Sequence, residues 1–75
     1  MPEYFKVKYP EQRDVFVDGS WMGKTNQKIE IGIGTYTINL GSPKDYVPKW
    51  RRPTIMNTTP SNPMIIEFQT IKEIA

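Results

Sequence analysis

The stretch VDGSWMGKT, from Val17 to Thr25, ends in Gly-Lys-Thr, the residue types that hold a nucleotide phosphate in a phosphate-binding loop. That motif places four residues between its two glycines, but only three separate Gly19 from Gly23. A phosphate-binding loop also leads into a helix whose N-terminus faces the phosphates. Here the residues that follow, NQKIEIGIG, alternate like a strand. We therefore predict a scaffold segment and not a nucleotide site.

The same stretch suits a β-hairpin. Asp18-Gly19 is a strong two-residue turn signal, because glycine tolerates positive φ. We expect the residues after the turn to pair back on residues 15–17. We also expect Gly23 to supply a second sharp bend and the Thr25 hydroxyl to bond to nearby backbone.

A second candidate for chemistry is Trp50, which lies among Lys49, Arg51 and Arg52. Base stacking on an aromatic ring with flanking cations is a common way to hold single-stranded nucleic acid. The competing interpretation places Trp50 in the core, with the cations facing water. Alternation puts Lys49 and Arg51 on the face opposite Trp50, which supports the core interpretation in part. A nucleic-acid-binding barrel that uses Trp50, Arg51, Arg52 and Lys24 stays the alternative.

Trp21 and Met22 are successive large side chains beside the turn, and one of them must point outward if they lie in a strand. An outward side chain near Lys24 would suit a partner contact, since aromatic residues and methionine are enriched in interfaces. The competing interpretation is that Trp21 closes one end of the fold. The candidate partner contacts are therefore Trp21, Met22, Lys24, Trp50, Arg51 and Arg52.

Residue usage argues against catalysis. The chain contains no cysteine and no histidine, which excludes Ser-His and Cys-His nucleophilic chemistry within it. A metal site would need carboxylates alone, and Asp14, Asp18 and Glu30 form no pattern suited to acid–base work. We expect no catalytic residue, no metal and no cofactor.

Length and charge set further bounds. The chain has 75 residues and a net charge of +2, so we expect one small domain over residues 1–75. The charge is too mild to indicate nucleic acid by itself. No apolar run approaches a membrane span, and the N-terminus lacks the apolar region of a signal peptide. We expect a cytoplasmic protein if Met1 is the natural start, and no compartment is predicted for a domain cut from a longer chain.

The elements that must position these residues show a period of two, which is typical of half-buried strands. Lys6 and Lys8 alternate with apolar residues and would suit an edge strand. With turn residues between the runs, the pattern predicts an all-β fold, a small antiparallel β-sandwich or open barrel of about six to seven short strands. The apolar faces are Phe5, Val7 and Tyr9; Ile29, Ile31 and Ile33; Tyr36, Ile38 and Leu40; and Met64, Ile66 and Phe68.

The middle of the chain is less regular, because Pro48 and Pro53 cannot donate hydrogen bonds to a sheet. We expect two strand pieces, at residues 46–51 and 54–57, with a break near Pro53. Only the tail QTIKEIA could be helical, and it could equally be a frayed end.

The order of features resembles the PEGA domain, from about Val15 to Phe68. The Pro-Glu-Gly-Ala sequence that names the family is absent, and Asn26 and Asp45 replace a usual proline and glycine. The resemblance implies a small β-sandwich accessory module of surface-layer, envelope or signalling proteins, without general catalytic activity. We therefore expect a non-catalytic module that binds a protein or a cell-envelope polymer. The matching residues are Val15, Val17, Asp18, Gly19, Gly23, Thr25, Gly34, Tyr36, Ile38, Leu40, Tyr46, Pro48 and Trp50.

Overall fold

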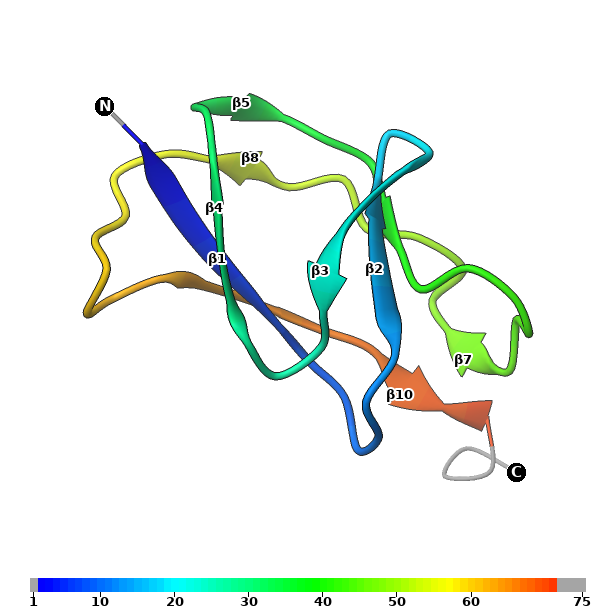
Figure 1. The fold of residues 1–75 in the computed structure, drawn as a ribbon. Helices are drawn as coiled ribbons and strands as arrows, with labels where there is room; N and C mark the ends of the chain where they lie inside the picture. Colours follow the sequence, from blue (N-terminus) through cyan, green and yellow to red (C-terminus); the bar gives the residue numbers. More distant parts are fainter. Residues whose placement is uncertain (1, 72–75) are drawn as a thin grey trace.

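A computed structural model describes residues 2–71, which form short β-strands and no α-helix (Figure 1). The predicted all-β class is confirmed, and the small, mainly antiparallel sheets are compatible with a β-sandwich or open barrel. The ten strands exceed the predicted number because five of them are only two residues long. They are β1 (Glu3–Lys8), β2 (Asp14–Val17), β3 (Ser20–Lys24), β4 (Lys28–Ile31), β5 (Gly34–Thr35), β6 (Ile38–Asn39), β7 (Tyr46–Val47), β8 (Thr54–Ile55), β9 (Met64–Glu67) and β10 (Gln69–Thr70).

The first sheet has the order β4-β1-β9. β1 is antiparallel to β4 but parallel to β9, so the fold is not purely antiparallel. The prediction that Lys6 and Lys8 mark an edge strand was wrong, because β1 has a neighbour on both sides. Their alternation is nevertheless as expected, since Phe5 and Val7 are buried on the opposite face.

The second sheet, β3-β2-β6, contains the predicted hairpin. Asp18 and Gly19 form its turn with φ of 49° and 86°, the left-handed region that a tight hairpin turn requires. The Thr25 hydroxyl accepts a hydrogen bond from Arg13 N at 2.8 Å and donates one to Glu11 O at 2.7 Å, as predicted.

Gly23 does not bend the chain, which corrects the prediction. It lies inside β3, where a β-bulge shifts the register so that Val15 pairs with Gly23 and Phe16 pairs with Trp21. A Cβ atom on Gly23 would come within 3.0 Å of Ile29 Cδ1. This glycine therefore makes room for a core side chain.

A third ladder pairs the chain from Gly34 to Ile38 with the chain from Ile55 back to Arg51. β5 and β8 form its first part, Tyr36 N donates to Pro53 O at 3.2 Å, and Ile38 and Arg51 exchange two hydrogen bonds. The predicted strand over residues 46–51 is correct at β7 and at the isolated bridge of Arg51, but residues 48–50 are not in a strand.

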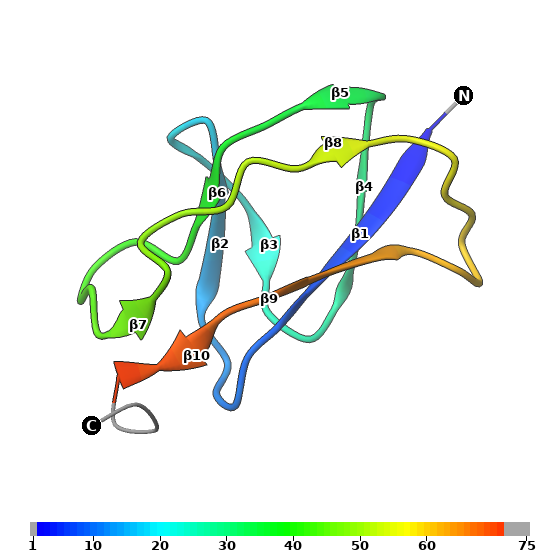
Figure 2. The same cartoon turned by 180° about the vertical axis from the view of Figure 1, so that it is seen from behind.

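The last strands close one end of the molecule, where β10 pairs with β7 (Figure 2). From that end, β9 and β8 diverge and are joined by the connection 56–63. The helical alternative for the tail is wrong at Gln69–Thr70, and residues 72–75 lie outside the described part of the chain.

All the sheets share one core, to which each predicted apolar face contributes. Ile33 is an exception and is exposed, because β4 already ends at Ile31. The buried apolar residues are Phe5, Val7, Tyr9, Val15, Val17, Ile29, Ile38, Leu40, Tyr46, Ile55, Ile66 and Phe68.

Candidate partner-binding surfaces

We infer from the strand register that Trp21 and Trp50 lie on the same side of the β3-β2-β6 sheet. Trp21 pairs with Phe16, and Phe16 pairs with Asn39 on its other side. The antiparallel bridge of Arg51 with Ile38, extended by one residue, sets Trp50 opposite Asn39, and Trp50 is exposed. We call this surface, formed by Asp14, Phe16, Trp21, Lys24, Asn39 and Trp50, the outer face.

Both tryptophans on the outer face are 57% exposed. The prediction that Trp50 fills the core was therefore wrong, and so was the idea that Trp21 closes one end of the fold. The predicted alternation around Trp50 is also not seen, because Lys49, Trp50, Arg51 and Arg52 are all exposed and residues 48–50 are not in a strand.

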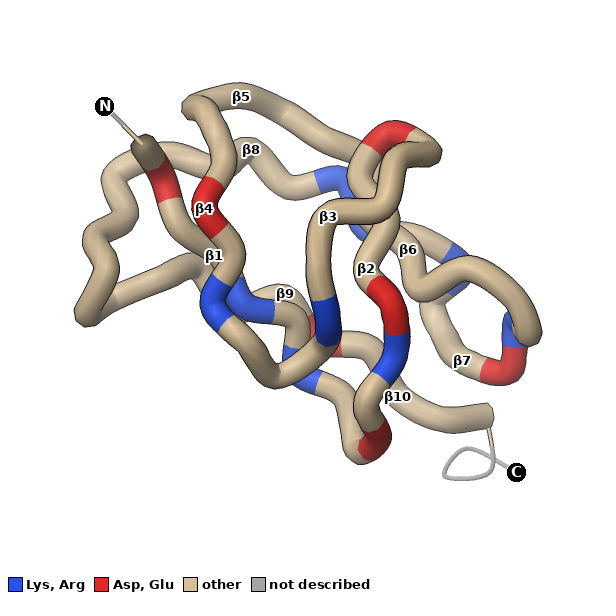
Figure 3. Tube along the Cα trace, in the orientation of Figure 1, with Lys and Arg blue, Asp and Glu red and all other residues tan. Residues whose placement is uncertain are grey.

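Polar contacts hold Trp21 in place on the outer face. Asp14 Oδ1 accepts hydrogen bonds from Lys24 Nζ at 2.6 Å and from Trp21 Nε1 at 3.1 Å. These two bonds, that of Lys24 first, hold the pKa of Asp14 below its usual value. The charges of Asp14 and Lys24 offset one another, and Figure 3 shows both signs interspersed along the trace.

Met22 does not belong to the outer face. The bulge in β3 turns it toward the interior, where it is partly buried and packs against the core. Of the two successive large side chains, one points outward and one inward, as predicted. Met22 thus packs against the core and stays only partly exposed.

Arg51 and Arg52 lie away from the outer tryptophans. The Arg51 backbone bonds to Ile38, and its side chain reaches across to β9, where Nε donates to Glu67 O at 3.2 Å. Arg52 is exposed and lines a groove beside β9 together with Arg51. Arg51 and Arg52 of the predicted basic cluster therefore stay together at this groove, whereas Lys49 and Trp50 are not among its lining residues.

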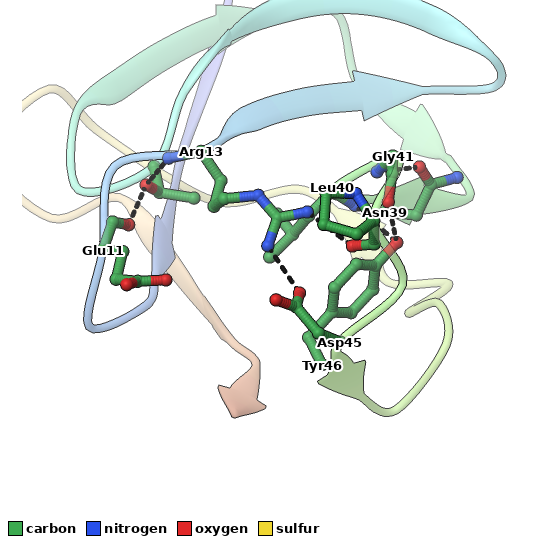
Figure 4. A network of polar contacts seen from close by, with 9 residues as sticks. Glu11, Arg13, Asn39, Leu40, Gly41, Asp45 and Tyr46 are labelled. Atoms are coloured by element: carbon green, nitrogen blue, oxygen red, sulfur yellow. Dashed lines mark hydrogen bonds and ion pairs between the residues drawn. The ribbon is translucent and has the colours of Figure 1, made fainter. Parts of the chain in front are cut away.

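Sequence reasoning missed a polar network around Arg13 (Figure 4). Its guanidinium donates to Asp45 Oδ1 and to Pro43 O, both at 2.7 Å. Only 13% of this side chain is exposed. Burial opposes its charge, but the hydrogen bond and charge of Asp45 outweigh burial and raise the pKa of Arg13. No motif marks Arg13, because its partners lie about thirty residues away in the chain.

Aromatic rings enclose the Arg13 guanidinium. Its central carbon lies 5.5 Å from the Tyr46 ring centroid and 5.9 Å from that of Tyr9, within cation–π range. The Tyr46 hydroxyl accepts from Leu40 N at 3.2 Å and donates to Gly41 O at 3.0 Å. This resembles the tyrosine corner of Greek-key sandwiches, in which a hydroxyl bonds to backbone a few residues upstream.

Tyr9 differs from Tyr46 in its polar contacts. Its hydroxyl is buried and has no hydrogen-bond partner within residues 2–71. Burial, followed by the negative charge of Asp45, raises the pKa of Tyr9. We call the part of the molecule formed by Tyr9, Arg13, Asp45, Tyr46 and Phe68 the closed end.

The hairpin of β2 and β3 has no phosphate-binding geometry. Lys24 is engaged by Asp14, Thr25 is buried, and the chain continues into the strand β4. Over residues 2–71, no three Asp or Glu side chains gather closely enough to hold a metal ion. The described chain also contains no helix with the length and apolar character needed to cross a membrane.

No family model matches this chain, and neither a curated protein nor a solved structure matches it. The resemblance to PEGA domains therefore stays a prediction from the sequence, and the structure places the chain among small all-β proteins.

Proposed function

We propose that this domain is a non-catalytic module that binds a protein or a cell-envelope polymer through its outer face. The observation that carries the proposal is the shared exposure of Trp21 and Trp50 on that face. Large aromatic side chains contribute most of the binding energy in many interfaces, because covering them removes much apolar surface from water. The resemblance to PEGA domains implies the same class of function.

The charge of the outer face favours a partner that is uncharged or weakly charged. Lys24 is paired with Asp14, and Phe16 and Asn39 lie between the two tryptophans. A polymer or protein surface that contacts both indoles would therefore meet aromatic rings and amide groups. Nucleic acid, in contrast, requires cations that are free to bind phosphates.

The two indole N–H groups supply a direct test. In an NMR titration of the labelled domain with soluble peptidoglycan fragments, or with a neutral glucan, we expect the signals of Trp21 and Trp50 to shift together. The double variant Trp21→Ala, Trp50→Ala should lose binding. Ile33→Ala, which removes an exposed apolar side chain outside the outer face, should retain it. A ligand that binds tightly and leaves both indole signals in place would contradict the proposal.

The second candidate, single-stranded nucleic-acid binding, is favoured by one observation. Trp50 is exposed, and so are the cationic residues around it, Lys49, Arg51 and Arg52. Titration with oligothymidine at several salt concentrations tests this alternative. Affinity that falls linearly with salt on logarithmic axes, and that is lost in Trp50→Ala, would support it over the outer-face proposal.

A further inference from the structure

A groove lies between β9 and the chain segment Arg51–Pro53. On this side of the molecule β8 and β9 diverge (Figure 2). The volume of the groove is about 480 Å³, and the lining residues are Arg51, Arg52, Pro53 and Met64–Glu67. This volume is in the range of roughly 300–1,000 Å³ that is typical of ligand sites. We call it the open groove, and it is distinct from the outer face.

One wall of the open groove is an unpaired strand edge. β9 is the last strand of its sheet and pairs only with β1. Phe68 N donates to Lys8 O at 3.1 Å, so the residues of β9 with even numbers direct their backbone groups toward β1. The N–H and C=O groups of Ile65 and Glu67 therefore face the groove. The bond from Arg51 Nε to Glu67 O, made across the groove, agrees with this orientation.

The opposite wall is a second unpaired edge. Arg51 bonds to Ile38, Pro53 O accepts from Tyr36 N, and Ile55 pairs with Gly34. The residues with odd numbers are thus directed toward β5 and β6. The backbone groups of Arg52 and Thr54 point the other way, toward β9.

An extended peptide is the ligand class that satisfies both walls at once. Each wall presents backbone donors and acceptors at the spacing of a strand, which a peptide backbone complements on either side. The two chain segments meet where β10 pairs with β7 and are joined at their other end by the connection 56–63, so the groove fits only a short peptide segment.

The charges around the groove define the peptide further. Arg51 and Arg52 lie on one wall of the groove. Lys6 and Lys8, on β1, line a neighbouring hollow that shares Ile65 with the groove. Glu67 is the one acidic side chain among the lining residues. The groove therefore complements negative charge.

We propose that the open groove binds an extended, acidic peptide segment of another protein, which adds to β9 as a strand. This binding uses main-chain hydrogen bonds and does not depend on the tryptophans of the outer face. The two proposals can therefore fail separately.

The test uses a blocked Glu-Val-Glu-Val-Glu-Val peptide as the probe and its Lys-Val-Lys-Val-Lys-Val counterpart as the control. We expect the acidic peptide to slow hydrogen exchange at the amides of Arg52, Thr54, Ile65 and Glu67, and the basic peptide to leave them unchanged. The indole signals of both tryptophans should stay in place.

Two variants separate main-chain from charge recognition. Ile65→Pro removes an N–H that faces the groove and spares the bonds to β1, so the domain should fold and lose the peptide. Arg52→Glu should weaken binding by about fivefold, the range of exposed ion pairs. Lys44→Glu makes the same charge change on the connection between β6 and β7 and should leave the affinity unchanged.

Several results would overturn the proposal. One is the absence of protection at these four amides at millimolar peptide. Another is equal binding of the acidic and basic peptides. Protection that depends on protein concentration without peptide would assign the groove to a second copy of the chain. If Ile65→Pro does not fold, the Arg52→Glu variant still tests the proposal. An affinity for the acidic peptide that is unchanged in Arg52→Glu would overturn charge-selective binding.

Discussion

The closed end and the open groove share two chain segments, residues 45–55 and 64–71. The two regions differ in how these segments meet. At the closed end, β7 pairs with β10, and Tyr46 contacts Phe68 edge to face with ring centroids 5.5 Å apart. Along the open groove, the segments diverge, and the bond from Arg51 Nε to Glu67 O spans them.

The side chains account for the difference. At the closed end the segments direct aromatic rings inward, and Arg13 fills the remaining space with paired polar atoms. Along the groove the side chains that meet are charged or exposed, such as Arg52 and Ile65. Stability is therefore expected to concentrate at the closed end, which leaves the groove edges free to pair with another chain.

The largest effect is expected from Gly41→Ala, at the glycine whose carbonyl oxygen accepts from Tyr46 of the closed end and which packs against Phe16 of the outer face. Gly41 has φ of 71°, and an added Cβ would lie 2.6 Å from Phe16 Cε1. Left-handed backbone and overpacking together predict a loss of about 2–4 kcal/mol in the free energy of unfolding. Urea denaturation followed by circular dichroism measures it. Gly19→Ala is the control, since Gly19 has positive φ but open space around it, and its cost should stay near 1 kcal/mol.

The two buried tyrosines offer a sharper test. Tyr46→Phe leaves the buried N–H of Leu40 without its partner and should cost about 1–3 kcal/mol. Tyr9→Phe removes a hydroxyl that has no partner among residues 2–71, so the free energy of unfolding should stay the same or rise. Equal losses in the two variants would show that the polar network at the closed end does not set stability.

A pH effect is expected at the connection 56–63. Glu3 Oε1 accepts from the Thr58 hydroxyl at 2.7 Å and from Thr58 N at 2.9 Å, which tethers the connection 56–63 to β1. The hydroxyl bond is the main cause that lowers the pKa of Glu3 from its ordinary 4.5. The tether is thus fully present above pH 4.5 and is lost as the pH falls through the folded-state value.

The Thr58 amide signal reports this titration directly. We expect a midpoint below 4.5 in the folded domain, with faster exchange in the connection below it. Glu3→Gln should abolish the pH dependence. A midpoint at or above 4.5 would show that the Thr58 contacts do not favour the carboxylate.

The smallest effect is expected from Ile65→Thr at the open groove. Ile65 is 56% exposed on an edge strand, and threonine keeps the β-branched shape. The free energy of unfolding should change by no more than about 0.5 kcal/mol. A loss as large as that of Tyr46→Phe would remove the proposed contrast between the two regions.

Local patterns predicted much of this fold. Alternation identified the buried faces of β1 and β9, and Asp18-Gly19 identified the hairpin. The parallel pairing of β1 with β9 was not predicted, because these strands meet across most of the chain and share no local signal. The edge-strand prediction from the lysines of β1 failed for the same reason. An outward lysine does not show whether its strand pairs with one neighbouring strand or with two.

The sequence indicated which residues are candidates for binding, but it did not predict where they lie on the folded surface. Trp21 and Trp50 were identified from their size and position, but their common face depends on the pairing of Arg51 with Ile38. Arg51 and Arg52 lie on the open groove, a feature that only the divergence of β8 and β9 creates. Arg13 had no signal at all, because its partners become neighbours only after folding.

The exposure of both tryptophans also determines what the intrinsic fluorescence of this protein can measure. They are the only two tryptophans in the chain, and water already surrounds more than half of each in the native state. The wavelength of their maximum emission should therefore change little when the protein denatures, although the core is lost. A ligand that covers them should shift the emission to shorter wavelengths. Intrinsic fluorescence is thus a poor probe of unfolding here and a sensitive probe of occupancy.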